Sequence, residues 1–376
     1  MNIIYFDNSA TTPIKTEVIN EMMPFLTREY GNASSLYSIG RISKRAIEKA
    51  RKKVSELINC GPHEIFFTAS GSESDNLAVK GVAYANKEKG NHIITSKIEH
   101  PAILETCKTL EKQGFDVSYI NVTEDGILDL EELQKAIKTS TILITVMTAN
   151  NEIGTIQPIE EIAQIAHQNN IIFHTDAVQG IGNMEIDVTK MGIDMLSLSG
   201  HKIHAPKGIG ALYIKNGIQC EKIINGGHQE RDKRAGTENV TGIVGLGKAC
   251  EIANKNMHAH IKNLMRLRDY YIKRLQKEIP DKIRINGTMK HRLPGNANVS
   301  FENINASELI FKLDEKGICV SSGSACSSGN TTASHVLTAI KVPKKYINSA
   351  IRTTFGDNNS FEEIDYLIKL IKREIL

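Results

Sequence analysis

The stretch MLSLSGHKIHAPKGIGALYI, residues 195–214, places two short β-type runs on either side of a loop that contains glycine and proline. Lys202 lies in this loop, directly after the first run and between His201 and His204. A solvent-exposed lysine is more often found on the polar face of a helix. In open α/β sheets, ligands bind at the carboxyl ends of the strands. We therefore expect Lys202 at a ligand site, provided that the surrounding chain forms such a sheet.

Apolar runs rich in β-branched residues alternate with helical patterns through the middle of the chain. The runs are EIFFT (64–68), NHIITS (91–96), DVSYINV (116–122), TILITVMT (141–148), NIIFHTD (170–176), MLSLS (195–199) and GALYI (210–214). Between them, segments such as 73–90 and 158–170 carry apolar residues three and four positions apart, which indicates amphipathic helices. This alternation predicts an α/β fold with a mostly parallel sheet and helices on both faces.

The pattern changes after a long helical stretch that covers residues 236–279. The segments that follow are strand-like ANVSFEN (297–303), strand-like GICVS (317–321) and helical EEIDYLIKLIKREIL (362–376). We therefore expect a large α/β domain over residues 15–255 and a smaller α+β domain over residues 256–376. Residues 1–14 are expected to join the smaller domain.

The composition excludes several classes of protein. Of 376 residues, 40% are hydrophobic and 24% are charged, as in ordinary globular proteins, so neither disorder nor a fibrous repeat is expected. The formal net charge is +3 without a long basic block, which gives no support for nucleic-acid binding. No apolar run approaches a membrane span, and the first residues lack the basic start and apolar segment of a signal peptide. We therefore expect a cytoplasmic protein.

The cysteines show no pattern of a disulfide framework or of a metal site. They include no CxxC pair, and reduced thiols are therefore expected. His201 and His204 have no carboxylate or third histidine at a usable spacing, so no metal site is expected either. The six cysteines are Cys60, Cys107, Cys220, Cys250, Cys319 and Cys326.

Three polar features follow predicted strands. ASGSESDNLA, residues 69–78, is a Gly and Ser turn that opens a helix and leaves backbone N–H groups for an anion, although an N-cap by Ser70 or Ser72 explains it equally well. Asp176 ends another run, where a carboxylate either pairs with a cationic ring nitrogen or caps the next turn. Together with Lys202, these features supply the phosphate cup, the ring-nitrogen partner and the Schiff-base amine that pyridoxal 5'-phosphate (PLP) requires.

Eight motifs, in order over almost the whole chain, resemble those of cysteine desulfurases, PLP enzymes of the class V aminotransferase group. The motifs are DNSATT (7–12), FTASGSESDNLA (67–78), TSKIEHPAIL (95–104), NNEIG (150–154), HTDAVQ (174–179), LSGHKIHAPKGIGALY (198–213), RAGTENV (234–240) and SSGSACSSG (321–329). The resemblance implies the fold of the PLP-dependent transferases, fold type I, with a large α/β domain and a smaller α+β domain.

The resemblance also implies roles for individual residues around the cofactor. Lys202 would form the Schiff base, Asp176 would pair with the pyridine nitrogen, and His100 would stack on the ring and act as an acid or base. The other implied cofactor-binding residues are Gln179 near the ring oxygen, Gly71, Ser72, Ser199 and His201 around the phosphate, Asn151, and Thr237 from the neighbouring subunit of a homodimer.

Asn151 and Arg352 are implied to bind the carboxylate of the substrate, with Asn32 as a further substrate residue close by. Apart from the motifs, Arg352 is equally explained by a surface ion pair and Asn151 by a turn. His100 is similarly explained by a position in the core or at a helix end.

Cys326 lies in VSSGSACSSGN, residues 320–330, where Ala325 is its only apolar neighbour. A thiol in such a loop is expected to be exposed and able to react, although an incidental surface cysteine fits the same pattern. The resemblance implies that Cys326 is the nucleophile that takes sulfur from L-cysteine as a persulfide, leaving L-alanine. A sulfur-acceptor or scaffold protein would then receive the sulfur, in iron–sulfur cluster assembly or another thiolation.

Three alternatives stay open at this point. A nucleotide-binding or scaffold protein would use the Gly and Ser turn for a phosphate without catalysis. A thiol redox protein would use Cys326 without a cofactor. Within the PLP enzymes, a selenocysteine lyase or another class V lyase is the nearest alternative.

Overall fold

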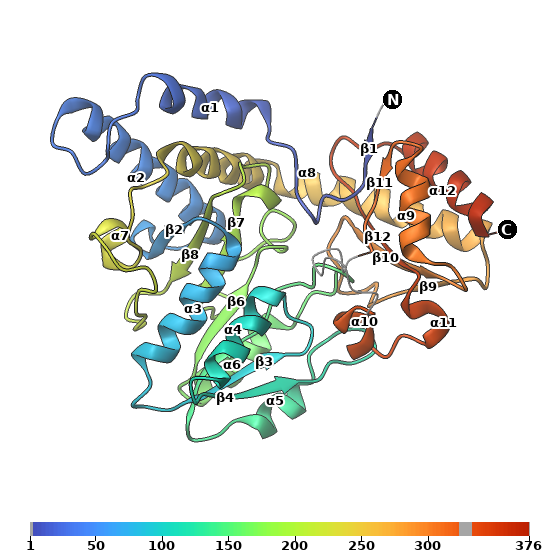
Figure 1. The fold of residues 1–376 in the computed structure, drawn as a ribbon, viewed down its shortest axis with the longest axis horizontal. Helices are drawn as coiled ribbons and strands as arrows, with labels where there is room; N and C mark the ends of the chain where they lie inside the picture. The colour runs from blue at the N-terminus through green and yellow to red at the C-terminus, as the bar shows by residue number, and fades with distance from the viewer. Residues whose placement is uncertain (1–2, 323–332, 376) are drawn as a thin grey trace.

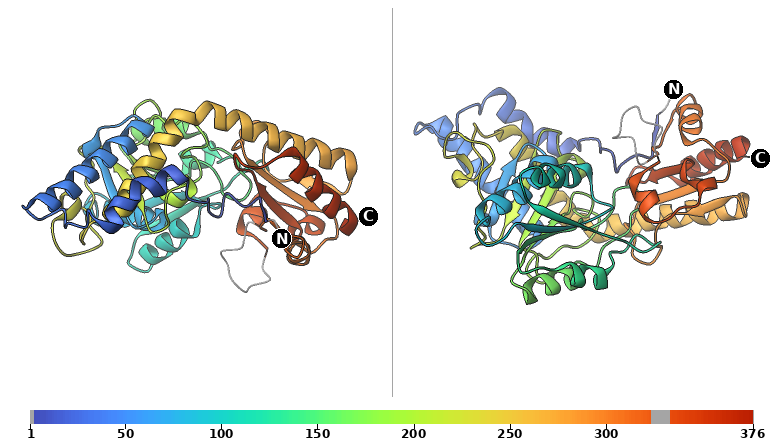
Figure 2. Two further views of the ribbon diagram at one scale, coloured as in Figure 1. Left: turned by 90° about the horizontal axis from the view of Figure 1, so that it is seen from above. Right: turned by 60° about the horizontal axis from the view of Figure 1, so that its bottom comes forward.

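The computed structural model describes residues 3–322 and 333–375, which form a larger and a smaller half (Figure 1). The larger half is built on a seven-stranded sheet, and the smaller half contains a three-stranded sheet and a two-stranded sheet. The two ends of the chain both lie at the smaller half (Figure 1). One long helix, α8 (Val240–Glu278), runs from the larger half into the smaller one (Figure 2).

All seven predicted runs form strands of the large sheet, in the order β2-β8-β7-β6-β5-β3-β4. Their bounds are β2 (Ile65–Thr68), β3 (His92–Ser96), β4 (Asp116–Ile120), β5 (Thr141–Thr145), β6 (Ile172–Asp176), β7 (Met195–Ser199) and β8 (Gly210–Ile214). β8 is antiparallel to both β2 and β7, whereas the other neighbouring pairs are parallel. Six strands therefore point the same way, which confirms the predicted α/β fold with a mostly parallel sheet.

Helices cover both faces of this sheet. The helices on one face are α2 (Ser38–Ile58), α5 (Leu130–Ala136), α6 (Ile159–Gln168) and the first part of α8, and those on the other are α3 (Gly71–Ala85) and α4 (Pro101–Glu111). Successive strand residues alternate between the two faces, so Ile65 and Phe67 pack with the first group and Phe66 with the second. Except for the partly exposed edge strand β4, the strands are consequently buried on both sides, as expected for a sheet of mainly parallel strands.

The smaller half has a core of its own. Its strands are β1 (Ile4–Tyr5), β9 (Ile283–Ile285), β10 (Asn296–Phe301), β11 (Ile318–Cys319) and β12 (Ala350–Thr354). β10 lies between β12 and β9 in an antiparallel sheet, while β1 pairs with β11 in parallel. The rings of Phe6 and Tyr271 each meet Phe355 edge-on in this core. The first strand of the chain is thus packed with its last third.

The remaining helices lie around these two cores. They are α1 (Thr16–Thr27), α7 (Gln229–Asp232), α9 (Ala306–Asp314), α10 (His335–Ala339), α11 (Lys344–Ile347) and α12 (Phe361–Ile375). Val336 and Leu337 of α10 pack with Ile98 and Met147, which lie in loops after β3 and β5. This contact joins the smaller half to the carboxyl edge of the large sheet. Across residues 3–322 and 333–375, no helix has both the length and the apolar character that crossing a bilayer requires.

The helix α8 belongs to both cores. Leu246 packs in the core of the larger half and Leu264 in that of the smaller half, and the helix is continuous between them. The domain boundary expected near residue 256 lies inside this helix, and the division into domains stays a prediction. At Gly247, α8 approaches α2 so closely that a Cβ atom would lie 2.6 Å from the Cα of Ala50.

We predict that Gly247→Ala lowers the free energy of unfolding by about 1–2 kcal/mol. The added methyl group meets backbone atoms of α2, and such overpacking costs up to about 3 kcal/mol. This loss exceeds the gain of about 1 kcal/mol that alanine brings to a helix interior. Urea unfolding measures the difference. Lys255→Ala, on an exposed part of the same helix, is the control and should change stability by less than about 0.5 kcal/mol. A variant as stable as the parent would contradict the close contact.

Candidate active site

A cavity of ≈ 290 Å³ opens at the carboxyl edge of the large sheet. Five of the strands that share one direction, β2, β3, β5, β6 and β7, deliver the segments that line it. The predicted site residues among its lining are Gly71, Ser72, His100, Asn151, Asp176, Gln179, Ser199, His201, Lys202 and Arg352. Predicted residues that are up to 281 positions apart in the chain therefore meet in one cavity, with Gly71 and Arg352 as the most distant pair.

The turn after β2 lies at one end of this cavity and has the features that suit an anion, so it is called the anion-binding turn. α3 begins at Gly71, and the Ser70 hydroxyl accepts the Glu73 N–H at 3.1 Å as the N-cap. The first N–H groups of the helix lack helical acceptors and carry the positive end of its dipole. A Cβ at Gly71 would lie 2.7 Å from Val178 Cγ2 and 3.3 Å from Ser199 Cβ. Glycine thus lets the turn pack directly against the ends of β6 and β7.

Asp176 and His100 lie deeper in the cavity. The Asp176 carboxylate is 5% exposed and accepts the Val178 N–H at 2.9 Å. Burial raises the pKa of Asp176, while His100, the Val178 N–H and Lys202 favour its ionised form. Burial also lowers the pKa of His100, so the ring is neutral near pH 7. Its Nδ1 accepts the Ala102 N–H at 3.1 Å, and the neutral ring therefore carries its proton on Nε2.

Lys202 follows β7 in a short 3₁₀ turn, Gly200–Lys202. Its Nζ donates to the carbonyl oxygens of Ser9 and Ala10, the latter at 2.9 Å. Gln179 Nε2 donates to the same Ser9 oxygen at 3.1 Å. The N-terminal turn DNSATT thus closes this side of the cavity.

Next to Lys202, burial and the lysine charge lower the pKa of His201 to about 4, so its ring is neutral. Its Nδ1 lies 3.1 Å from the Thr11 hydroxyl oxygen.

Arg352, on β12 of the smaller half, enters the cavity from the opposite side. Its guanidinium donates to the Asp7 carboxylate at 2.7 Å and to the Asn151 carbonyl at 3.1 Å. The side chain is 5% exposed, and its Nε has no hydrogen-bond partner among the described residues. A buried guanidinium with a donor to spare is a suitable partner for a carboxylate ligand.

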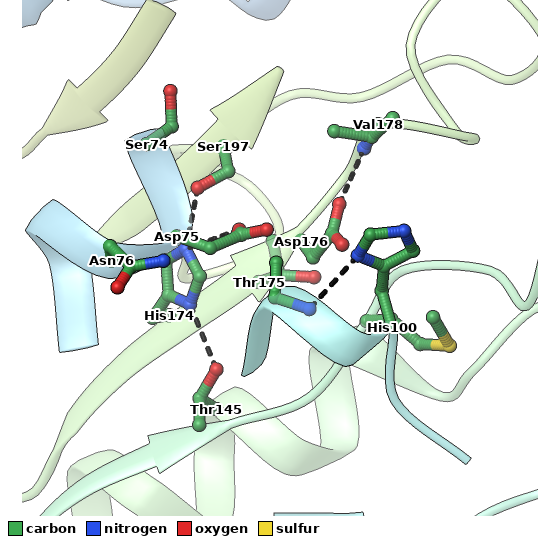
Figure 3. A network of polar contacts seen from close by, with 12 residues as sticks. Ser74, Asp75, Asn76, His100, Thr145, His174, Thr175, Asp176, Val178 and Ser197 are labelled. Atoms are coloured by element: carbon green, nitrogen blue, oxygen red, sulfur yellow. Dashed lines mark hydrogen bonds and ion pairs between the residues drawn. The ribbon is translucent and has the colours of Figure 1, made fainter. Parts of the chain in front are cut away.

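A polar network behind Asp176 escaped the sequence analysis (Figure 3). His174 is fully buried, lies 2.8 Å from Thr145 Oγ1 and 3.0 Å from Ser197 Oγ, and is neutral because burial lowers its pKa to about 3. Asp75 lies 3.9 Å from His174, and its Oδ1 has no hydrogen-bond partner in the described part of the chain. Burial, followed by the charge of Asp176, raises the pKa of Asp75 well above its ordinary value.

In the sequence, Asp75 is one of several polar residues at the start of a helix, between Ser74 and Asn76. Such a residue is usually on a solvent-exposed face, so the pattern alone gives no reason to place it in the core. Ser9 and Ala10, whose carbonyls hold Lys202, lie inside a quoted motif but act through their backbone.

Three predicted site residues are not found at the cavity among the described residues. Thr237 and Asn32 are exposed and do not line the cavity of their own chain. Cys326 lies outside the described residues. The roles of all three stay predictions.

The floor of the cavity suits a cation. Potential ligand atoms of Asp75, His100 and Asp176 lie within 4.8 Å of one another, so two buried carboxyl groups are close together. A positive charge placed against Asp176 would relieve their repulsion. The protonated ring nitrogen of PLP carries such a charge, the turn at Gly71 suits its phosphate, and Lys202 suits its aldehyde. The residues present therefore fit this cofactor.

Fold and site together define a class of protein, the α/β proteins that place a lysine, a strand-end carboxylate and an anion-binding helix end around one cavity. Within that class, the chain belongs to the aminotransferase class-V family, whose family model matches residues 4–367.

Relatives and solved structures resemble the chain over nearly its whole length. "Cysteine desulfurase IscS" of Methanosarcina thermophila is 51% identical over 98% of this chain and 91% of its own. A solved structure described as a "NifS-like protein" is 39% identical, with a TM-score of 0.93 and 99% of each chain covered. Another, "SspA in complex with cysteine", is 37% identical with a TM-score of 0.84, and covers 95% of this chain and 99% of that one.

A further buried carboxyl group next to the site gives a pH-dependent prediction. Glu99 precedes His100, accepts from the Ser96 hydroxyl at 2.6 Å, and burial raises its pKa from 4.5 to about 8. Between these two pKa values, Glu99 keeps its proton in the folded chain but is ionised in the unfolded chain. Since the folded pKa is the higher one, this contribution to stability is present below about pH 4.5 and is lost as the pH rises to about 8.

In the parent, the free energy of unfolding should fall between about pH 5 and about pH 8 as Glu99 ionises. We predict a smaller fall in Glu99→Gln, because the amide cannot ionise. Urea unfolding at both pH values, compared with the parent, measures the effect. Glu105→Gln, at an exposed position in α4, is the control and should keep the parent's pH dependence. An equal decrease in the parent and in Glu99→Gln would contradict the assignment.

Proposed function

We propose that this protein is a PLP-dependent cysteine desulfurase that converts L-cysteine to L-alanine and transfers the sulfur to Cys326 as a persulfide. The observation that carries the proposal is one cavity in which Lys202, Asp176 and the Gly71–Ser72 turn surround a space beside Arg352. The desulfurase names of relatives about half identical to the chain support it, as does the cysteine named with one similar structure.

The cofactor would be held at three points. The first N–H groups of α3, with Ser199 and His201 beside them, would bind the phosphate, and Asp176 would pair with the ring nitrogen. Lys202 would form the Schiff base. Bound PLP supplies an electron sink for an amino acid attached to it, which is the chemistry that weakens the bonds at the substrate's α-carbon.

The chain's own residues would bind the substrate and move its protons. The guanidinium of Arg352 and the side chain of Asn151 would bind the α-carboxylate, which places the amino group of cysteine towards Lys202. The amine of Lys202 would take the α-proton of the substrate. The Nε2–H of neutral His100 is available to donate a proton near the departing sulfur.

In the proposed sulfur transfer, the thiolate of Cys326 attacks the sulfur of cysteine. A new S–S bond forms and the C–S bond breaks, so that cysteine and the enzyme thiol become alanine and an enzyme persulfide. The persulfide would then pass its outer sulfur to an acceptor or scaffold protein in the cytoplasm, as in iron–sulfur cluster assembly.

The proposed active form is a homodimer in which Thr237 of each subunit reaches the phosphate of the other. An apolar stripe on α1 supports association with a second copy of the chain. Ile19, Met23 and Leu26 are spaced four and three residues apart, and they are 43%, 44% and 60% exposed. Burying such a stripe against a second subunit would be favourable.

We predict that Lys202→Ala removes the covalent cofactor bond and lowers alanine formation from L-cysteine by roughly a thousandfold or more, because it loses both the Schiff base and the base for the α-proton. Borohydride reduction followed by mass spectrometry detects the bond, and amino-acid analysis detects the alanine. Lys207→Ala, at an exposed position in the same loop, is the control. A borohydride-reducible cofactor bond in Lys202→Ala would show that another lysine carries the cofactor.

We predict that Cys326→Ser keeps the fold and the bound cofactor but loses persulfide formation and nearly all turnover of L-cysteine, because only the thiol takes up sulfur. Visible absorbance measures the cofactor, and mass spectrometry measures the persulfide. Cys60→Ser, a partly buried thiol at the end of α2, is the matched control. Turnover by Cys326→Ser at the parent's rate, without added thiol, would mean that Cys326 is an incidental surface residue.

A further inference from the structure

The segment before α8 follows a strained path. Within α7, Glu230, Arg231 and Asp232 have φ angles of 43°, 51° and 64°, all in the left-handed region. Each such residue costs roughly 1–2 kcal/mol when it is not glycine. Three in succession persist only where the surrounding structure holds them. The contacts of residues 228–237, here called the α7 segment, therefore need an explanation.

The first contact ties the α7 segment to β2. Glu230 is almost fully buried, and its carboxylate accepts from both terminal nitrogens of Arg51, at 2.7 and 2.8 Å. The same carboxylate accepts the Phe67 N–H at 2.8 Å, and Arg51 also donates to the Ile65 carbonyl at 2.8 Å. α7 lies beside β2 at the edge of the larger half (Figure 1). This bidentate pair thus fixes the segment to the strand that leads into the anion-binding turn.

The second contact reaches that turn itself. Arg234 donates to the Glu73 carboxylate at 2.8 Å from Nε and at 3.4 Å from Nη2. Glu73 also accepts the Ala69 N–H at 3.0 Å. Because Glu73 directly follows Ser72 in the first turn of α3, the ion pair joins the α7 segment to the helix end where the phosphate would bind.

Rather than lying at its own cavity, Thr237 is presented outwards by this doubly anchored segment. It is only three residues beyond Arg234, and it is exposed. The segment is therefore fixed at one end to its own subunit's turn and leaves Thr237 accessible to a second copy.

We propose that Glu73 and Glu230 are positioning residues that couple the phosphate site of one subunit to that of the other. Glu230 fixes the α7 segment to β2, and Glu73 fixes it to the anion-binding turn of the same subunit. Thr237 is thereby held in place for the partner's phosphate site. The proposal rests on the homodimeric PLP enzyme proposed above. Loosening the segment in one subunit should consequently weaken cofactor binding in its partner, which contains no altered residue.

The test uses mixed dimers of full-length chains. One subunit carries Lys202→Ala with Arg234→Gln and its partner is unaltered, so the borohydride-reducible cofactor belongs to the unaltered subunit alone. Loss of that cofactor after dilution measures its release. We expect release roughly ten times faster than from dimers whose altered subunit carries only Lys202→Ala, the effect of about one lost hydrogen bond. Arg234 is chosen because removal of Glu230 would leave Arg51 buried without its carboxylate and endanger folding.

Two further versions of the altered subunit complete the test. Arg274→Gln, which removes an ion pair with Asp365 between α8 and α12, should leave cofactor release from the unaltered partner unchanged. Arg234→Lys should restore slower release in part, because one charged donor remains. The proposal would be overturned if Arg234→Gln did not accelerate cofactor release from the unaltered partner. It would also be overturned if the chains stayed monomeric.

Alanine formation in the parent separates this proposal from the proposed function. A parent that forms alanine but shows no effect of Arg234→Gln across the dimer refutes the coupling alone. A parent that shows the effect on cofactor release but forms no alanine refutes the desulfurase activity alone.

Discussion

The common direction of the strands in the large sheet is the constraint on which the site depends. β8 runs against both of its neighbours, so β2 recovers the direction of β7, and the carboxyl ends of five strands meet at one edge. Asp176 is the last residue of β6, and Gly71, His100, Asn151 and Lys202 follow the ends of the other four strands. The reversal of any one of these strands would remove its residue from the cavity, because each side chain is placed by the length and direction of a buried strand.

This arrangement has an electrostatic cost. Asp75, Glu99 and Asp176 are fully or nearly fully buried, and burial is the main cause that raises the pKa of each. An ionised carboxylate in such a place loses several kcal/mol of hydration unless a cation or several donors compensate. Among the described residues, Lys202 supplies a positive charge that favours the ionised form of Asp176. A cationic ring against Asp176 would supply another, so the site is better satisfied with the cofactor than without it.

Much of this could be predicted from the sequence. The seven β-type runs predicted the whole large sheet, because strands buried on both faces carry strong apolar signals. The reversed β8 was not predicted, since strand direction depends on tertiary pairing. Asp75 was missed for the same reason, because its neighbours come from β6 and β7 rather than from its own helix. Thr237 and Asn32 were assigned by resemblance alone, and a site shared between subunits cannot be derived from one chain's hydrophobic pattern.

The placement of the first residues has a consequence for how the chain matures on the ribosome. β1 pairs with β11 and Asp7 pairs with Arg352, although the partners are made hundreds of residues later. During translation, β1 must wait for the last third of the chain before it can pair, although Ser9 and Ala10 already have Lys202 as a partner. A nascent chain that stops before β12 would contain the anion-binding turn, Asp176 and Lys202 but not Arg352, the residue proposed to bind the substrate carboxylate. If Arg352 binds the substrate carboxylate as proposed, amino-acid binding would be reserved for polypeptides whose synthesis has passed β12.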